Sequence, residues 1–156
     1  MKLLFVCTGN ICRSPMAEAV MQHKIIEQGL DDLWSCDSCG THGYHAGEGA
    51  DPRTIDTLRQ HNVDASGLVS RPLIGNDYTD FDLVLAMDRG HRQFLTQKMP
   101  FGLETEIRLM MEFGNDPAHP DVPDPYYGIS GGFEAVYTMI DQACDGLLNT
   151  YKHDRK

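Results

Sequence analysis

The amino-acid sequence predicts an α/β fold in which a four-stranded parallel sheet is flanked by helices on both faces. Strand-like and helix-like segments alternate along the chain, as they do when right-handed crossovers join parallel strands. The strand candidates include short apolar runs such as residues 3–6, which suit strands buried on both sides. The 156 residues are enough for a substantial core, and we expect a single domain over residues 1–156.

The first half of the chain is expected to supply two strands and two helices. Ser14 is expected to be the N-cap of the first helix, with Pro15 at the first helical position, and Gly29 to end that helix. No regular element is predicted in the Gly- and His-rich loop that follows the second strand, or after the second helix. The predicted elements are a strand at 3–6, a helix at 14–28, a strand at 31–38 and a helix at 52–62.

The second half of the chain is expected to complete the sheet and to end in a long helix. The predicted elements are a strand at 81–86, a helix at 88–98, a strand at 106–110 and a closing helix at 130–151. Residues 114–128 contain four prolines and many acidic residues, so we expect a long loop there. Loops of this length in compact domains are usually functional.

Composition excludes several classes of partner. The formal net charge of −10 argues against nucleic acid, which is bound by basic surfaces. The N-terminal apolar run is too short for a signal peptide, and no stretch is long enough to span a membrane. Five cysteines, an odd number, do not suit a disulfide scaffold. We therefore expect a cytoplasmic, monomeric protein that has no membrane partner.

The segment between the first strand and the first helix has the properties of a phosphate-binding loop. Loop N–H groups and a helix N-terminus converge there on an anion. Cys7 begins the loop and Arg13 closes it, so that a readily ionised thiol lies beside a guanidinium that can hold two phosphate oxygens. Gly9 and Asn10 tolerate the positive φ that turns N–H groups inward. A cysteine at a strand end can also be a simple core residue, but this setting favours a nucleophile.

The sequence CTGNICRSP at residues 7–15 resembles the signature of the low-molecular-weight protein tyrosine phosphatases. The similarity continues along nearly the whole chain, through residues 38–41, 51–53, 87–88 and 124–128. The motifs at 7–15 and 124–128 are specific, and those between them only support the alignment. The resemblance implies a flavodoxin-like fold and an enzyme that needs no metal or other cofactor. It also implies phosphotyrosine-containing proteins as substrates, and phosphate or other oxyanions as competitive ligands.

The resemblance implies hydrolysis through a phosphocysteine intermediate. Cys7 would attack phosphorus in line, while Arg13 and the loop N–H groups hold the equatorial oxygens. Ser14 is expected to donate a hydrogen bond to the Cys7 sulfur. The loop residues expected to bind substrate are Thr8, Gly9, Asn10, Ile11, Cys12 and Ser14.

The departing phenolate needs a general acid, and an acidic residue on the long loop at residues 114–128 suits this role. The residues alone leave Asp116, Asp121 and Asp124 open as candidates. The resemblance selects Asp124, because it opens the DPYY motif that holds the general acid of the family. The same residue would then act as the base for the attacking water.

Aromatic residues are expected to set substrate choice. Tyr126 and Tyr127 would form walls that match a flat phenyl phosphate. The resemblance places Tyr44 at a further wall position that varies between family members. Relatives that act on phosphoarginine tend to carry Thr at the position of Ile11, so Ile11 and the two tyrosines favour phosphotyrosine.

Three alternative functions stay open. A protein-arginine phosphatase of the same family is the closest alternative. An arsenate reductase would need resolving cysteines near the third strand, and residues 75–100 contain none. A non-catalytic phosphate-binding or redox module would have no need of nucleophile, arginine and acid together.

Two residues depart from the family pattern. Leu68 stands where many members have a histidine that orders the phosphate loop through Asn10 and Ser14. A leucine cannot form those hydrogen bonds, so the rigidity of the loop is in question. His91 stands where asparagine is common.

The other cysteines have different expected roles. Cys12 could capture an oxidised Cys7 as a protective disulfide. Cys36 and Cys39 are three residues apart on a strand, so they should point to opposite faces rather than bind a metal together. We expect both of them, and Cys144 in the closing helix, to be core residues.

Overall fold

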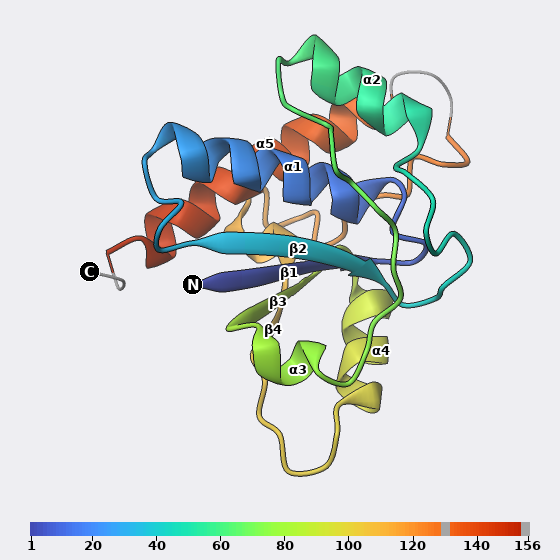
Figure 1. Cartoon of the computed structure of the whole chain (residues 1–156), viewed down its shortest axis with the longest axis vertical. Helices are drawn as coiled ribbons and strands as arrows, with labels where there is room; N and C mark the ends of the chain where they lie inside the picture. The colour runs from blue at the N-terminus through green and yellow to red at the C-terminus, as the bar shows by residue number, and fades with distance from the viewer. Residues whose placement is uncertain (129–131, 154–156) are drawn as a thin grey trace.

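The computed structural model describes residues 1–128 and 132–153, and within them it has the predicted architecture (Figure 1). Four parallel strands form one sheet in the order β2-β1-β3-β4. The strands are β1 Lys2–Cys7, β2 Ser35–Gly40, β3 Leu83–Ala86 and β4 Ile107–Leu109. The helices are α1 Arg13–Glu27, α2 Pro52–Gln60, α3 Asp77–Asp80, α4 Arg89–Lys98 and α5 Gly132–Tyr151, with a 3₁₀ turn η1 at Met110–Phe113.

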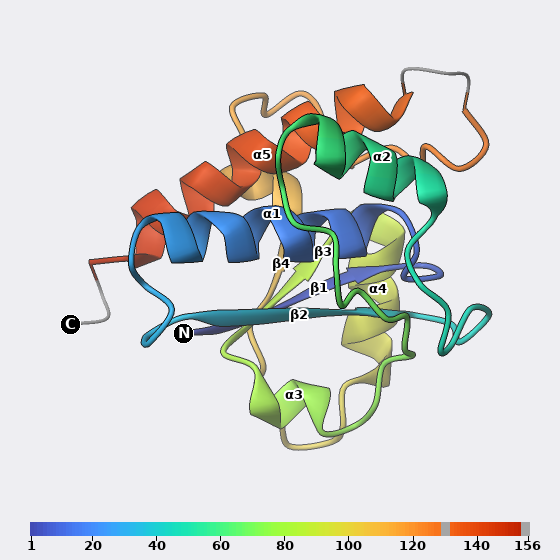
Figure 2. The same cartoon turned by 45° about the horizontal axis from the view of Figure 1, so that its top comes forward.

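Helices cover both faces of the sheet, as predicted. α1, α2 and α5 lie over one face, and α3 and α4 over the other (Figures 1 and 2). Strand β1 shows why its sequence is apolar from Leu3 to Val6: Leu3 and Phe5 pack in the core on the α1 side, and Leu4 and Val6 in the core on the α4 side. Strands buried on both faces cannot alternate apolar with polar residues.

The first helix ends as predicted but begins differently. Gly29 follows it with φ +68°, and the N–H of Leu30 donates to the carbonyl of Ile25 at 2.9 Å, which closes the helix end. The N-cap is Cys12, so the prediction that Ser14 caps this helix is wrong. Ser14 lies in the first turn, and its hydroxyl meets the Cys7 sulfur instead of a helix N–H.

Other elements also differ from the predictions, most clearly β2 and α3. Strand β2 begins at Ser35 rather than at residue 31, because the N–H groups of Leu33 and Trp34 turn back to the carbonyl of Leu30. The four-residue α3 was not predicted, since a single turn is too short to show helical periodicity. The predicted start of the closing helix at residue 130 lies outside the described residues. In the described part of the chain no helix is long and apolar enough to cross a membrane.

The carboxyl ends of the strands bring the functional segments together. The loop after β1 passes close to the end of β2, where a Cβ on Gly40 would lie 2.7 Å from the Thr8 carbonyl oxygen and 2.8 Å from that of His42. Only glycine fits at such a close backbone approach. Ligands of open α/β sheets bind at this edge.

Candidate active site

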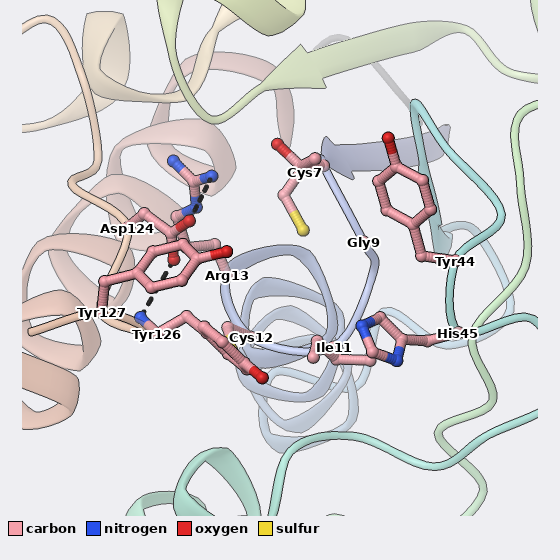
Figure 3. Close-up of a pocket in the computed structure, with 11 residues that line it drawn as sticks. Cys7, Gly9, Ile11, Cys12, Arg13, Tyr44, His45, Asp124, Tyr126 and Tyr127 are labelled. Carbon is pink, nitrogen blue, oxygen red and sulfur yellow. Dashed lines mark hydrogen bonds and ion pairs between the residues drawn. The ribbon is translucent and has the colours of Figure 1, made fainter.

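A pocket of about 160 Å³ opens at the carboxyl end of β1 (Figure 3). It is lined by Cys7, Thr8, Gly9, Ile11, Cys12, Arg13, Tyr44, His45, Asp124, Tyr126 and Tyr127. All the predicted site residues except Asn10 and Ser14 are in this lining. His45 was not predicted, although it adjoins Tyr44 in the sequence. A Cβ on Gly9 would lie only 3.1 Å from the His45 ring, so the small loop residue makes room for it.

Two buried polar residues behind the pocket orient the Cys7 thiol. The Cys7 sulfur lies 3.0 Å from the Ser14 hydroxyl oxygen. That oxygen accepts a hydrogen bond from the Asn10 side-chain amide at 2.8 Å. Because Ser14 accepts from Asn10, its own hydrogen is available to the sulfur; the other acceptor in reach, the Cys39 carbonyl, is farther away at 3.4 Å. The arrangement can stabilise a thiolate.

Asn10 is the centre of a hydrogen-bond network that holds the loop. It has φ +57°, as predicted, whereas Gly9 does not adopt positive φ. Its amide also donates to the Ser38 hydroxyl at 2.9 Å, and its side-chain oxygen accepts from the Arg71 N–H at 3.0 Å. The Ser70 hydroxyl donates to the Asn10 carbonyl at 2.5 Å. The side-chain amide, the side-chain oxygen and the main-chain carbonyl of this buried residue therefore each have a partner within the protein.

The network extends to α1 and does not involve Leu68. The Ser38 hydroxyl donates to the Glu18 carboxylate at 2.6 Å. Leu68 packs its side chain into the core on the α1 side. Ser70 and Arg71, two and three residues further along, make the ordering contacts with Asn10. The loop is thus ordered without a histidine at position 68.

The Arg13 guanidinium is buried and held by two different segments. Its Nη1 donates to the Asp88 carboxylate at 3.0 Å and to the Val122 carbonyl at 2.9 Å. Its Nη2 lies 3.7 Å from the Asp124 carboxylate. Val122 is itself fixed to the end of β3, because its N–H donates to the Met87 carbonyl at 2.8 Å. Arg13 therefore ties the phosphate loop to the segment that carries Asp124.

A buried histidine supports the first residue of the loop. The Nε2 atom of His91 lies 2.8 Å from the Thr8 hydroxyl, and its Nδ1 lies 3.1 Å from an Asp88 carboxylate oxygen without hydrogen-bond geometry. Burial lowers the pKa of His91 to about 4, with Arg13 adding to the effect and Asp88 opposing it. The imidazole is therefore neutral at neutral pH. Asp88 also caps α4 through the His91 N–H.

Of the three acidic residues left open by the sequence, Asp124 lies in the pocket. One of its carboxylate oxygens accepts from the Tyr126 N–H at 3.0 Å, and the side chain is 39% exposed. Asp121 is paired with Arg89, and their hydrogen bonds hold the pKa of the Asp121 carboxyl below its usual range. Hydrogen bonding to His119 and to the backbone does the same for Asp116, and neither residue lines the pocket.

Aromatic rings line opposite sides of the pocket, with the Cys7 sulfur pointing between them (Figure 3). Tyr44 stands on one side, and Tyr126 and Tyr127 on the other, their two rings edge to face at 4.8 Å. The Arg53 guanidinium, from α2, lies against the Tyr126 ring and donates to the main-chain carbonyl of Tyr126 at 3.2 Å. A flat ring attached to a phosphate would fit between these walls.

The remaining cysteines are accounted for by burial. Burial raises the pKa of Cys12 to about 12, with a smaller contribution from Asp51, so Cys12 is a neutral thiol at neutral pH. All five cysteines are free thiols, and a disulfide between Cys7 and Cys12 stays a hypothesis. As predicted, Cys36 and Cys39 pack on opposite faces of the sheet, and Cys144 is in the core.

A metal site is not formed by the residues that the structure describes. Among them no group of three or more His, Cys, Asp or Glu side chains is placed to hold an ion. The positive charge offered to a ligand in the pocket comes instead from Arg13.

Comparisons with known proteins match this geometry. The family model described as low molecular weight phosphotyrosine protein phosphatase matches residues 2–156. A low molecular weight protein-tyrosine-phosphatase of Streptomyces coelicolor is 43% identical over 94% of this chain and 91% of its own length. A protein tyrosine phosphatase structure from Entamoeba histolytica has a TM-score of 0.92 and 38% identity, covering 99% of this chain and 98% of that one. The structure of a Drosophila arginine phosphatase has a TM-score of 0.90 and 33% identity, covering 97% and 98%.

Proposed function

Since this chain belongs to the low molecular weight phosphotyrosine protein phosphatase family, we propose that it hydrolyses phosphotyrosine in proteins through a phosphocysteine on Cys7. One observation carries the proposal. A buried thiol, a buried guanidinium and a carboxylate, those of Cys7, Arg13 and Asp124, line a single pocket between aromatic walls. These are the nucleophile, the charge and the proton source that hydrolysis of a phosphate monoester requires.

In the first step the thiolate of Cys7 attacks phosphorus, and the S–P bond forms as the bond from phosphorus to the phenolic oxygen breaks. Arg13 and the loop N–H groups stabilise the charge on the three equatorial oxygens. Protonated Asp124 gives its proton to the departing oxygen, and the phenol leaves neutral. The hydrogen bond from Ser14, aligned by Asn10, favours the ionised sulfur before attack.

In the second step water attacks the phosphocysteine. The Asp124 carboxylate accepts a proton from that water, and the S–P bond breaks to release phosphate and the Cys7 thiolate. The Ser14 hydroxyl again stabilises the sulfur, now as the leaving group. Inorganic phosphate and other oxyanions would compete for the same loop.

We propose a cytoplasmic location and a monomeric enzyme of one domain. A catalytic thiol stays active only in reducing surroundings, and all five thiols are free. The substrates would be proteins, because the tyrosine walls are exposed to solvent, where the polypeptide that carries a phosphotyrosine can contact them.

Phosphoarginine is the second candidate substrate. Its basis is the similarity to the Drosophila arginine phosphatase structure. Ile11 and the aromatic walls favour the phenyl ring of phosphotyrosine instead, because a planar apolar ring gains more from these surfaces than a guanidino group does.

The test is phosphate release from a phosphotyrosine peptide and from phosphoarginine by the wild type, Cys7→Ser and Cys36→Ser. Cys36 is a matched control, since its thiol lies outside the pocket. We expect release from phosphotyrosine that is lost in Cys7→Ser and kept in Cys36→Ser. Preference for phosphoarginine would overturn the substrate assignment, and full activity of Cys7→Ser would overturn the mechanism.

A further inference from the structure

We propose that a second pocket beside the active site binds an aliphatic side chain of the substrate polypeptide, two or three residues away from the phosphotyrosine. This inference rests on the proposed function, and it narrows the substrates to phosphotyrosine segments that have an aliphatic residue nearby. The second pocket, called the flanking pocket here, has a volume of about 190 Å³. It is lined by Thr41, Leu73, Ile74, Gly75, Tyr78, Phe94 and Lys98.

The flanking pocket is mainly apolar and open. Ile74 is 53% exposed, and Leu73 and Phe94 are half-buried. Tyr78 is buried, and its hydroxyl already donates to the Leu95 carbonyl at 2.7 Å, so this hydroxyl needs no hydrogen-bond partner from a ligand. A Cβ on Gly75 would meet no atom within 4 Å, so this residue leaves space rather than filling it. A surface of this kind gains free energy by covering apolar area.

Two ring contacts join the flanking pocket to the active site. The His42 ring stacks on the active-site wall residue Tyr44, with centroids 5.0 Å apart and an interplanar angle of 7°. The His42 ring also contacts the Phe94 ring of the flanking pocket, with centroids 5.7 Å apart. Successive residues of an extended chain are about 3.3 Å apart, so about three residues span these two ring contacts. A bound peptide can therefore reach both pockets.

The backbone at residues 41–42 also fixes the position of the flanking pocket relative to the active site. The N–H of Thr41 donates to the Cys7 carbonyl at 2.9 Å, and that of His42 donates to the Thr8 carbonyl at 3.1 Å. Thr41 is also part of the flanking pocket lining. The distance from the phosphate loop to the flanking pocket is thus set by main-chain hydrogen bonds and not by side chains alone.

The positive charge of Lys98, at the flanking pocket, indicates which residue of the bound peptide would lie beyond the aliphatic one. The ammonium group of Lys98 lies 5.8 Å from the centre of the Phe94 ring, and among the described residues it forms no ion pair within 4.0 Å. The chain as a whole carries a net charge of −10, so this local cation stands out. The occupant is therefore a phosphotyrosine segment with an aliphatic residue in the flanking pocket and an acidic residue beyond it.

The experiment uses peptides with one phosphotyrosine in a Gly-Ser-Ala background, in which a leucine is moved from three residues before it to three residues after. Para-nitrophenyl phosphate, which cannot reach the flanking pocket, is measured in parallel. We expect leucine at one position two or three residues away to raise kcat/KM about 5- to 10-fold, which is less than full burial of such a side chain is worth, because the pocket is open to solvent. Ile74→Asp and Phe94→Ala should each abolish that gain, while their rates on para-nitrophenyl phosphate stay within about twofold of wild type.

Phe101→Ala is the matched control, because Phe101 is fully exposed and does not line the pocket. This variant should keep the leucine effect. A flat leucine scan, or a leucine gain that survives Ile74→Asp, with normal hydrolysis of para-nitrophenyl phosphate, would overturn the flanking pocket alone. Absence of any hydrolysis by the wild type would overturn the proposed function and with it this inference. A change from dimer to monomer on Ile74→Asp would assign the pocket to self-association instead.

Discussion

The phosphate loop and the segment that carries Asp124 face each other across the pocket, yet they are held in different ways. Asn10 in the loop is buried and bonded to Ser14 at the start of α1, to β2 and to residues 70–71. On the other side Asp124 is 39% exposed and Tyr127 is 87% exposed. A binding loop that must hold three oxygens needs fixed donors, whereas an acid needs only to reach one oxygen. Substitutions in the loop should thus lower both the stability of the protein and the rate of hydrolysis. Substitutions in the segment that carries Asp124 should lower the rate alone.

The largest effect is expected on the exposed side. Asp124→Asn removes the proposed proton donor and should lower kcat on phosphotyrosine about 10²- to 10³-fold with an unchanged melting temperature. Steady-state kinetics and thermal unfolding check both. Asp121→Asn is the control, because Asp121 is paired with Arg89 outside the pocket.

The dependence on leaving group sharpens this prediction. A phenolate of low basicity departs without a proton, so Asp124→Asn should lose much less rate on para-nitrophenyl phosphate than on phenyl phosphate. Equal losses on both substrates would assign Asp124 a binding role rather than that of an acid.

On the buried side, Asn10→Ala should lower both stability and rate. It removes the amide that aligns Ser14 and holds Ser38, and leaves the Arg71 N–H without its partner. We expect a loss of about 2–4 kcal/mol in unfolding free energy and of about 10- to 100-fold in kcat/KM. Urea unfolding and kinetics measure the two.

Asn62→Ala separates the backbone contribution from the network. Asn62 also has positive φ, 59°, but it is exposed. Its replacement should cost about 1 kcal/mol and leave the rate unchanged. If Asn10→Ala costs no more than Asn62→Ala, the network does not hold the loop.

A smaller effect is expected from Arg53→Ala. Arg53 supports the Tyr126 wall through its carbonyl and its ring. Losing that support should raise KM for phosphotyrosine about 3- to 10-fold with little change in kcat, since the wall binds ground state and transition state alike. Arg59→Ala, on the same helix but away from the pocket, should leave KM unchanged. A matching rise in KM in both variants would show a general charge effect.

At the outer end of the loop network, at Glu18, the expected effect is on the pH dependence of stability. Burial raises the pKa of the Glu18 carboxyl from 4.5 to about 7, opposed by the Ser38 hydrogen bond; the Asp37 charge adds to the rise and Arg71 opposes it. Between these two values the folded protein keeps a proton that the unfolded chain has lost. Unfolding free energy should therefore fall as pH rises from about 4.5 to about 7, and this contribution is constant above pH 7.

Glu18→Gln should flatten that slope. Urea unfolding at pH 5 and at pH 8 measures it, with Glu27→Gln as the control on the exposed side of the same helix. A slope that is the same in wild type and Glu18→Gln would show that another group is responsible.

Local features of the site could be predicted from the sequence, and its long-range partners could not. The strand, loop and helix around Cys7 follow from an apolar run and from residues that tolerate positive φ, within one short segment. The contacts that order this segment come from Ser70 and His91, which lie far along the chain. No pattern in the sequence around Cys7 predicts these contacts. The prediction that Ser14 is an N-cap was wrong for a different and local reason, because its hydroxyl is engaged by the Asn10 amide and the Cys7 sulfur within the same segment.

The choice among acidic residues shows the same limit. Nothing in the residues themselves separated Asp116, Asp121 and Asp124, and it was the resemblance that selected Asp124. The structure shows what distinguishes them: Asp121 is occupied by Arg89, and Asp116 by His119, while Asp124 faces the pocket. Pairings of this kind depend on where the loop folds back, which composition does not determine.

The most direct measurement is to look for the phosphoryl group on Cys7. Asp124→Ala, which slows the attack of water, is mixed with a substrate of good leaving group such as para-nitrophenyl phosphate, quenched with acid, and analysed by mass spectrometry of its peptides. The thiolate mechanism predicts one phosphoryl group on the peptide that contains Cys7, and none in Cys7→Ser. Phosphate release that continues while Cys7 never carries the phosphoryl group would contradict it.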